Sequence, residues 1–143
     1  TDIITSPSLL RARWEKLCWN IPFSGLAVAA GGITTDIIMG DPGLRQAAVS
    51  LMHEVITAGN ADLEHHQERP RIDRGAMVDR MLSRTSTMGA YRPSALIDFV
   101  ENRAMEIEAI FGEPLRRAGF LKIDTPYLSL LTAVLRSLNR DRR

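Results

Sequence analysis

Apolar residues recur every three or four positions along most of this chain, and this spacing constrains its fold more than any other feature. The clearest example follows Asp41-Pro42, where one helical face carries Leu44, Ala47, Ala48, Leu51, Met52, Val55 and Ile56. No segment alternates apolar and polar residues over a useful length, as a half-buried strand would. The sequence therefore predicts an all-α fold.

Capping residues and helix breakers divide this pattern into helices. The first is predicted to open at Ser6-Pro7 or at Ser8, to kink at Pro22, and to stop near Ala30 before Gly31-Gly32. The next long helix starts at Asp41-Pro42 and is expected to end at Gly59-Asn60, unless residues 61–66 extend it. Other expected elements are a short turn at 35–39 and helices capped by Asp73, opened by Pro93, running from Ile107 to Gly119, and capped by Thr125-Pro126.

Length and composition favour a single helical domain over residues 1–143. The chain is long enough for one core and too short for two ordinary domains. Its 45% hydrophobic and 24% charged residues are typical of a soluble globular domain. Eighteen basic and seventeen acidic residues leave a formal charge of +1, which argues against a nucleic-acid-binding surface.

The cysteine count and the lack of long apolar runs indicate where in the cell the protein is expected. A single cysteine, Cys18, excludes a disulfide framework within one chain. We expect no membrane span, because Pro22, Ser24 and Gly31-Gly32 interrupt the longest apolar run. With no secretory signal in view, the cytoplasm is the expected compartment. Because the chain begins at Thr1 without methionine, we expect that it was processed or cut from a longer protein.

A polar stripe interrupts the apolar first helix. Lys16, Asn20 and Ser24 are spaced by four and project from one face, on a helix that otherwise reads as hydrophobic on all sides and is expected to be buried. An ammonium group there must be paired, hydrated in a cleft, or shifted in pKa, which is typical of a catalytic lysine. The alternative is a snorkelling lysine paired with Glu15 or Asp36.

A second pair of polar residues, Ser94 and Glu106, follows in the second half of the chain. Twelve residues of straight helix would turn them to different sides, so a break around residues 101–104 is required if both line one cleft. Structural roles remain open: Asn20 as a cap at the break near Pro22, Ser94 as a stabiliser of its first helical turn, and Glu106 as an ordinary first-turn acid.

The run Glu64, His65, His66 and Glu68 suggests metal binding at first sight. Adjacent histidines point apart on regular structure, however, and no distant set of ligands is evident. The segment from His65 to Arg74 also contains Pro70 and is strongly charged. We therefore interpret it as a solvated loop and predict no metal site.

Three short segments carry a resemblance to a known family. They are Arg13-Trp14-Glu15-Lys16-Leu17-Cys18-Trp19-Asn20, Pro93-Ser94-Ala95-Leu96-Ile97-Asp98 and Met105-Glu106-Ile107-Glu108-Ala109-Ile110. In this order they resemble the C-terminal domain of the ketopantoate reductase (2-dehydropantoate 2-reductase) family, and the resemblance covers essentially the whole chain. It implies a helical fold of the kind found at the C-terminus of 6-phosphogluconate dehydrogenase.

The resemblance also implies roles for individual residues. The enzymes of this family reduce a 2-keto acid with NADPH, and the lysine that matches Lys16 protonates the ketone oxygen. The residues that match Asn20 and Ser94 hold the substrate, and the one that matches Glu106 orients substrate or cofactor. Ser24 and Thr34 stand where the best-known members have asparagines that contact substrate. Both changes leave the lysine chemistry intact and bear on which keto acid is bound.

The family binds NADPH on an N-terminal Rossmann domain, which this chain is not expected to contain. Neither Gly31-Gly32 nor the run from Gly40 to Gly43 follows a strand or has the G-x-G-x-x-G spacing. The sequence is thus interpreted as the substrate-binding and dimerisation domain of an NADPH-dependent 2-keto acid reductase, inactive without its Rossmann domain and expected to form homodimers. The alternatives are a stand-alone helical interaction module without catalysis and an all-α ligand-sensing regulatory domain.

Overall fold

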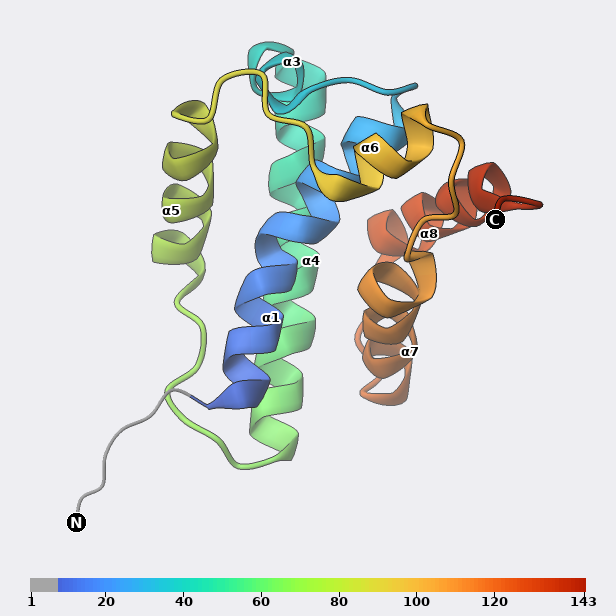
Figure 1. Ribbon diagram of the computed structural model, residues 1–143. Helices are drawn as coiled ribbons and strands as arrows, with labels where there is room; N and C mark the ends of the chain where they lie inside the picture. Colours follow the sequence, from blue (N-terminus) through green and yellow to red (C-terminus); the bar gives the residue numbers. More distant parts are fainter. Residues whose placement is uncertain (1–7) are drawn as a thin grey trace.

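The computed structural model describes residues 8–143, and all regular structure in this range is helical (Figure 1). The predicted all-α fold is confirmed. In chain order the elements are α1 (Leu9–Trp19), the π-helical segment η1 (Asn20–Ser24), α2 (Gly25–Ala29), α3 (Thr35–Gly40), α4 (Pro42–His65), α5 (Arg74–Ser86), α6 (Ser94–Val100), the π-helical segment η2 (Glu108–Gly112), α7 (Glu113–Phe120) and α8 (Pro126–Asn139).

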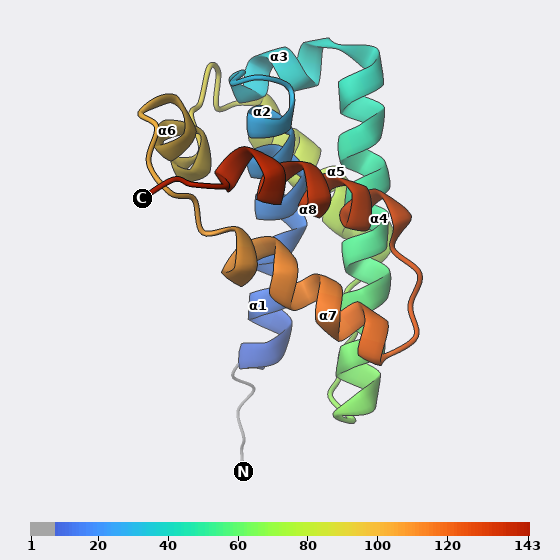
Figure 2. The same ribbon diagram turned by 90° about the vertical axis from the view of Figure 1, so that its right-hand side faces the viewer.

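The long helix α4 organises the arrangement. α1 runs beside it, α5 lies on one side of this pair, and α7 and α8 lie on the other (Figure 1). Seen from that other side, α8 and α7 cross in front of the inner helices, and α6 stands at the edge (Figure 2). The core between them includes the fully buried side chains of Ile21, Phe23, Ile38, Met52, Ile56, Leu63, Leu96, Phe111, Leu128 and Leu135. No helix within residues 8–143 has the length and apolar character needed to cross a membrane.

The first helix begins and bends at predicted places. The Ser8 hydroxyl accepts a hydrogen bond from the Arg11 backbone N–H (3.1 Å), so Ser8 is the cap, whereas Ser6-Pro7 lies outside the described residues. At Pro22 the chain passes through η1, a π-helical turn. Because proline has no N–H to donate to the carbonyl four residues earlier, the helix widens locally instead of simply kinking.

The expectation that this helix is buried on all sides is wrong for its first half. Trp14 and Cys18 are buried against α4, whereas Arg13 and Lys16 on the opposite face are exposed. Burial on all sides begins only at residues 21–25, where α4, α6 and η2 all contact η1. Lys16 is therefore hydrated, which is one of the three states that the sequence leaves open for it.

Two glycines predicted to end helices do not end them: the extension that the sequence leaves open after Gly59-Asn60 is present, and Gly119 lies inside its helix. α4 continues through Gly59-Asn60 to His65. A Cβ atom at Gly59 would lie 3.0 Å from Trp14 Cγ, so this glycine lets the indole approach α4. Similarly, Gly119 lies within α7, and the residue with positive φ that follows the helix is Lys122 (φ 61°).

Two predicted side-chain caps are not made, and one of them is replaced from another helix. Asp73 and Thr125 occupy the N-cap positions of α5 and α8, but neither side chain makes a capping hydrogen bond. The carboxylate of Glu54, on α4, instead accepts the backbone N–H groups of Tyr127 (2.9 Å) and Leu128 (2.8 Å). A neighbouring helix thus supplies the acceptors, and the carboxylate also complements the helix dipole.

The predicted break between Ser94 and Glu106 is confirmed. α6 ends at Val100, a turn follows with Asn102 at φ 61°, and helical structure resumes only at residue 107. The Asn139 side chain holds the intervening segment, because its Oδ1 accepts from the Met105 N–H (2.8 Å) and its Nδ2 donates to the Met105 carbonyl (3.3 Å).

A buried carboxylate, Asp62, joins three helices. It is 3% exposed, and it accepts a hydrogen bond from Trp14 Nε1 of α1 (3.0 Å) and one from Arg117 Nε of α7 (2.8 Å). His66 Nδ1 lies 3.3 Å from the same carboxylate. A buried carboxylate is stable only with such hydrogen-bond partners. Because charge-assisted hydrogen bonds are directional, each donor group is held in a defined position. Asp62 therefore sets how α1 and α7 sit on α4.

We expect Asp62→Ala to lower the free energy of unfolding by roughly 2–3 kcal/mol, because the Trp14 N–H and the Arg117 guanidinium lose their charged partner. The figure is at the low end for a buried pair since the Arg117 side chain is 31% exposed and can turn to water. Urea unfolding followed by circular dichroism measures the change. The matched control is Asp73→Ala, an exposed aspartate whose side chain caps nothing. Equal stability of the two variants would contradict the role of Asp62.

Candidate functional site

Lys16 and Asn20 line the same surface hollow, of about 590 Å³, between α1 and α5. The other residues that line it are Ala12, Glu15, Trp19, Arg80, Met81 and Arg84. The Lys16 side chain is exposed, and no carboxylate of residues 8–143 lies within ion-pair distance of it. The alternative pairing of Lys16 with Glu15 or Asp36 is not seen, because Glu15 faces Arg11 (3.8 Å) and Asp36 accepts from Thr34.

Ser24 does not face this hollow. Its side chain is 1% exposed, and its hydroxyl donates to Asn20 Oδ1 (2.7 Å). This bond orients the Asn20 amide and leaves its NH₂ group without a partner among the described residues. Asn20 is thus held by the π-helical turn and by Ser24, with its donor group free for a ligand. Ser24 therefore contacts Asn20 and does not line the hollow.

Trp19 fixes the edge of the hollow. Its Nε1 donates to the Thr85 hydroxyl of α5 (2.9 Å), which in turn donates to the Met81 carbonyl (2.6 Å). The indole stacks on Phe23 (5.4 Å between ring centroids) and meets the edge of Tyr91 (5.9 Å). The loop that precedes Ser94 is therefore anchored beside the Lys16 stripe.

Ser94 and Thr34 lie near this region without lining the hollow. Ser94 is the exposed first residue of α6, which packs against η1, the segment that contains Asn20. Thr34 occupies the N-cap position of α3 without a capping hydrogen bond, and its hydroxyl donates to Asp36. The backbone N–H of Thr35 donates to the Tyr91 carbonyl (3.1 Å), which ties this turn to the loop before Ser94.

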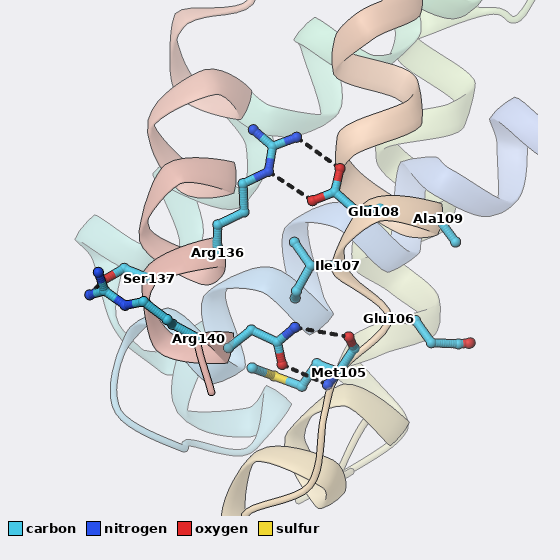
Figure 3. Close-up of a pocket in the computed structure, with 9 residues that line it drawn as sticks. Met105, Glu106, Ile107, Glu108, Ala109, Arg136, Ser137 and Arg140 are labelled. Atoms are coloured by element: carbon cyan, nitrogen blue, oxygen red, sulfur yellow. Dashed lines mark hydrogen bonds and ion pairs between the residues drawn. The ribbon is translucent and has the colours of Figure 1, made fainter. Parts of the chain in front are cut away.

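Glu106 borders a different hollow, of about 640 Å³, between residues 105–109 and the end of α8 (Figure 3). Its side chain is exposed and points away from Arg136 (Figure 3). The structure thus brings Lys16 and Asn20 together and sets Ser94, Thr34 and Glu106 around them. That Lys16, Asn20, Ser94 and Glu106 converge on one ligand stays a prediction.

Sequence reasoning missed two arginines and one ion pair. Arg80 and Arg84 line the Lys16 hollow from α5, and their spacing of four with polar neighbours is the signal that could have indicated a shared face. The missed ion pair joins Glu108 to Arg136, whose guanidinium donates twice to the carboxylate (2.8 and 2.9 Å), as Figure 3 shows.

The Arg136 and Arg116 guanidinium groups lower the pKa of Glu108 to about 2. Arg116 donates its own hydrogen bond to the same carboxylate (3.1 Å). Gly112 makes room for this cluster, because a Cβ atom there would overlap the Glu108 carboxylate and lie 3.0 Å from Arg136 Nη2.

Cys18 is the opposite case: burial raises the pKa of its thiol to about 12, so it is an inert core residue and no nucleophile.

The Glu108 pKa makes the stability of this corner depend on pH. Since the folded pKa lies below the ordinary value of 4.5, the stabilisation is complete above about pH 4.5 and is lost as pH falls towards 2. We expect Glu108→Gln to reduce the fall in melting temperature over this window, measured by thermal circular dichroism. The control is Glu68→Gln, which removes a carboxylate that forms no ion pair among the described residues. This variant should keep the wild-type dependence of melting temperature on pH.

The histidine-rich end of α4 is built differently from the predicted loop, because His65 still belongs to the helix. Glu64 pairs with Arg71 (3.3 Å) and His66 faces Asp62. Within the described residues 8–143 there is no group of three or more His, Cys, Asp or Glu side chains placed to hold a metal ion.

Comparison with known proteins identifies the relatives of this chain. A sequence model described as "Ketopantoate reductase PanE/ApbA C terminal" matches residues 8–139. The chain belongs to the ketopantoate reductase family. A 2-dehydropantoate 2-reductase from Nostoc sp. is 36% identical over 135 residues, which cover 94% of this chain and 40% of that protein.

Solved structures of family members have the same fold. The 2-dehydropantoate 2-reductase of Geobacter metallireducens is 38% identical with a TM-score of 0.85, over 93% of this chain and 42% of that one. A dimeric ketopantoate reductase from Staphylococcus aureus is 26% identical with a TM-score of 0.82, over 98% and 46% of the two chains. This chain therefore spans less than half the length of these relatives and corresponds to their C-terminal part.

Proposed function

We propose that this chain is the substrate-binding part of an NADPH-dependent reductase that converts a 2-keto acid into a 2-hydroxy acid. The observation that carries the proposal is the state of Lys16. Its ammonium group is exposed in a hollow, faces no carboxylate of the described residues, and stands one turn from the oriented amide of Asn20. Such a cation is free to approach the oxygen of a ligand.

The chemistry of this pair suits carbonyl reduction. Negative charge develops on the ketone oxygen as the adjacent carbon is reduced, and Lys16 would stabilise that charge and transfer its proton to the oxygen. Asn20 would donate its free N–H to the substrate, and Ser94 would add a hydroxyl from α6. Glu106 would orient substrate or cofactor from the segment held by Asn139, and Thr34 would line the outer part of the pocket.

The cofactor is expected to bind largely outside this chain. Gly31 and Gly32 adopt positive φ at the end of a helix, and residues 40–43 join two helices, so neither turn fits the strand-to-helix site that cradles a dinucleotide. A bound NADPH would supply the hydride, and we propose that an N-terminal Rossmann domain holds it. A reductase that depends on this cofactor would act where NADPH is regenerated, which favours the cytoplasm.

A chimera tests this function. Residues 8–139 replace the matching C-terminal part of the Nostoc relative, and NADPH oxidation is followed with several branched 2-keto acids. We expect the chimera to reduce at least one of them and Lys16→Ala to lower kcat by about 10²- to 10⁴-fold, the usual contribution of a general acid.

The control uses the second lysine of the chain: Lys122→Ala, on the loop after α7, should keep full turnover. The isolated 143-residue chain should neither bind NADPH tightly nor oxidise it. A folded chimera that reduces no 2-keto acid, or a Lys16→Ala variant with normal kcat, would contradict the proposed mechanism.

We also propose that the chain forms a homodimer through α8. Tyr127, Leu130, Val134 and Leu138 form an exposed apolar stripe along this helix, and Leu130 alone is 67% exposed. Exposed stripes of this kind mark association surfaces, and the related S. aureus enzyme is dimeric.

We expect sedimentation equilibrium to give a dimer for the wild-type chain and a monomer for Leu130→Glu, since a buried carboxylate without a partner opposes association. The control is Ile37→Glu, which adds the same charge to an exposed apolar position on α3. A wild-type chain that remains monomeric at high micromolar concentration would exclude this dimer.

A further inference from the structure

The hollow that contains Lys16 is also lined by cationic side chains that have no role in the proposed reaction. Three cations line it, Lys16, Arg80 and Arg84, against one acid, Glu15. Glu15 already faces Arg11 (3.8 Å). No carboxylate of residues 8–143 lies within ion-pair distance of Arg80 or Arg84. The positive charge of the hollow therefore favours binding of an anionic ligand.

We propose that Arg84 and Arg80 form a subsite for the carboxylate of the substrate. The proposal rests on the proposed function, because it takes the ligand to be a 2-keto acid whose ketone oxygen faces Lys16. A guanidinium group binds a carboxylate through two parallel hydrogen bonds, whereas an ammonium group is a point charge. The two kinds of cation in this hollow therefore suit the two ends of such a substrate: arginine the carboxylate, lysine the ketone oxygen.

The position of α5 supports this division. α1 and α5 run in the same direction (Figure 1), and the Trp19–Thr85 hydrogen bond (2.9 Å) sets their register. Arg84 directly precedes Thr85, so it stands level with the Trp19 and Asn20 end of the hollow. Arg80 lies one turn before it on the same face. Both arginines thus rise from a helix that is fixed against the helix of Lys16.

The substrate itself requires the two anchors to be close. In a 2-keto acid the carboxylate is bonded directly to the ketone carbon, so whatever binds the carboxylate must share the hollow with Lys16. Arg136, which lines the hollow beside Glu106, is already engaged by Glu108 at 2.8 and 2.9 Å. Arg80 has only the Met77 sulfur as an acceptor (3.6 Å) among the described residues, so its other N–H groups remain for a ligand.

The floor of the hollow is apolar. Met81, which is 3% exposed, and the half-buried Trp19 indole both line it. Apolar walls strengthen a charge-assisted hydrogen bond because they lower the local dielectric constant. They also offer a surface for the branched carbon chain of a keto acid. At about 590 Å³ the hollow is within the size range of small-molecule sites.

Binding to the 143-residue chain provides the direct test. 2-Oxo-3-methylbutanoate is titrated into the wild-type chain, Arg84→Gln, Arg80→Gln and the double variant, and followed by ¹H–¹⁵N chemical shifts. We expect each single variant to raise the Kd about tenfold or more, the loss of one charge-assisted contact. Arg45→Gln, an exposed arginine on α4 away from the hollow, is the matched control and should bind as the wild type does.

The uncharged methyl ester of the same acid separates a carboxylate site from general loss of structure. The ester should bind the wild-type chain more weakly than the acid and should bind all variants equally. Arginine variants that bind the acid with wild-type affinity, an ester whose binding falls in parallel, or a wild-type chain that does not bind the acid would each overturn the subsite.

Kinetics of the Nostoc chimera distinguish this proposal from the proposed function. Arg84→Gln should raise the KM for the keto acid about tenfold with a smaller change in kcat, whereas Lys16→Ala acts mainly on kcat. If the chimera reduces keto acids with an unchanged KM in Arg84→Gln, the subsite is wrong and the function stands. If the chimera is inactive while the chain binds the acid through its arginines, the function is wrong and the subsite stands.

Discussion

The contact of Asp62 with Trp14 and Arg117 is the interaction on which the arrangement of helices depends. It joins α1, α4 and α7 at one buried point, with hydrogen bonds of 3.0 and 2.8 Å. Gly59, one turn earlier on α4, makes the approach of the Trp14 indole possible. Because α1 is held on this side, its other face, which carries Lys16, is left towards solvent. The exposure of the candidate site is thus a consequence of where the core is anchored.

The two π-helical turns among residues 8–143 lie beside predicted site residues. η1 contains Asn20 and Ser24, and η2 begins two residues after Glu106. π-Helical turns insert an extra residue and are frequent at functional sites because they change the direction of side chains. In η1 this change coincides with burial of the Ser24 hydroxyl against the Asn20 amide. The two π-helical segments also contact one another.

The structure agrees with the sequence-based predictions where the signal is local. The break between Ser94 and Glu106 follows from the geometry of a single helix, and the Ser8 cap from the chemistry of one side chain. The two differ where a distant residue replaces the local one: Glu54 caps α8 from α4, although Thr125 stands at the cap position. At Gly59 the sequence favoured a helix end and left an extension open, and the glycine instead provides the contact surface for Trp14 inside α4.

The sequence alone determined the all-α class, the order of the helices and the family, because apolar spacing and short motifs are properties of the chain itself. It also singled out Lys16 and Asn20 as residues of one helical face. Only the tertiary structure decided that Arg84 of α5 shares their hollow and that Glu106 borders another one. The physical reason is that pairing between helices depends on contacts such as Trp19–Thr85 and Asp62–Arg117, whose partners lie 66 and 55 residues apart.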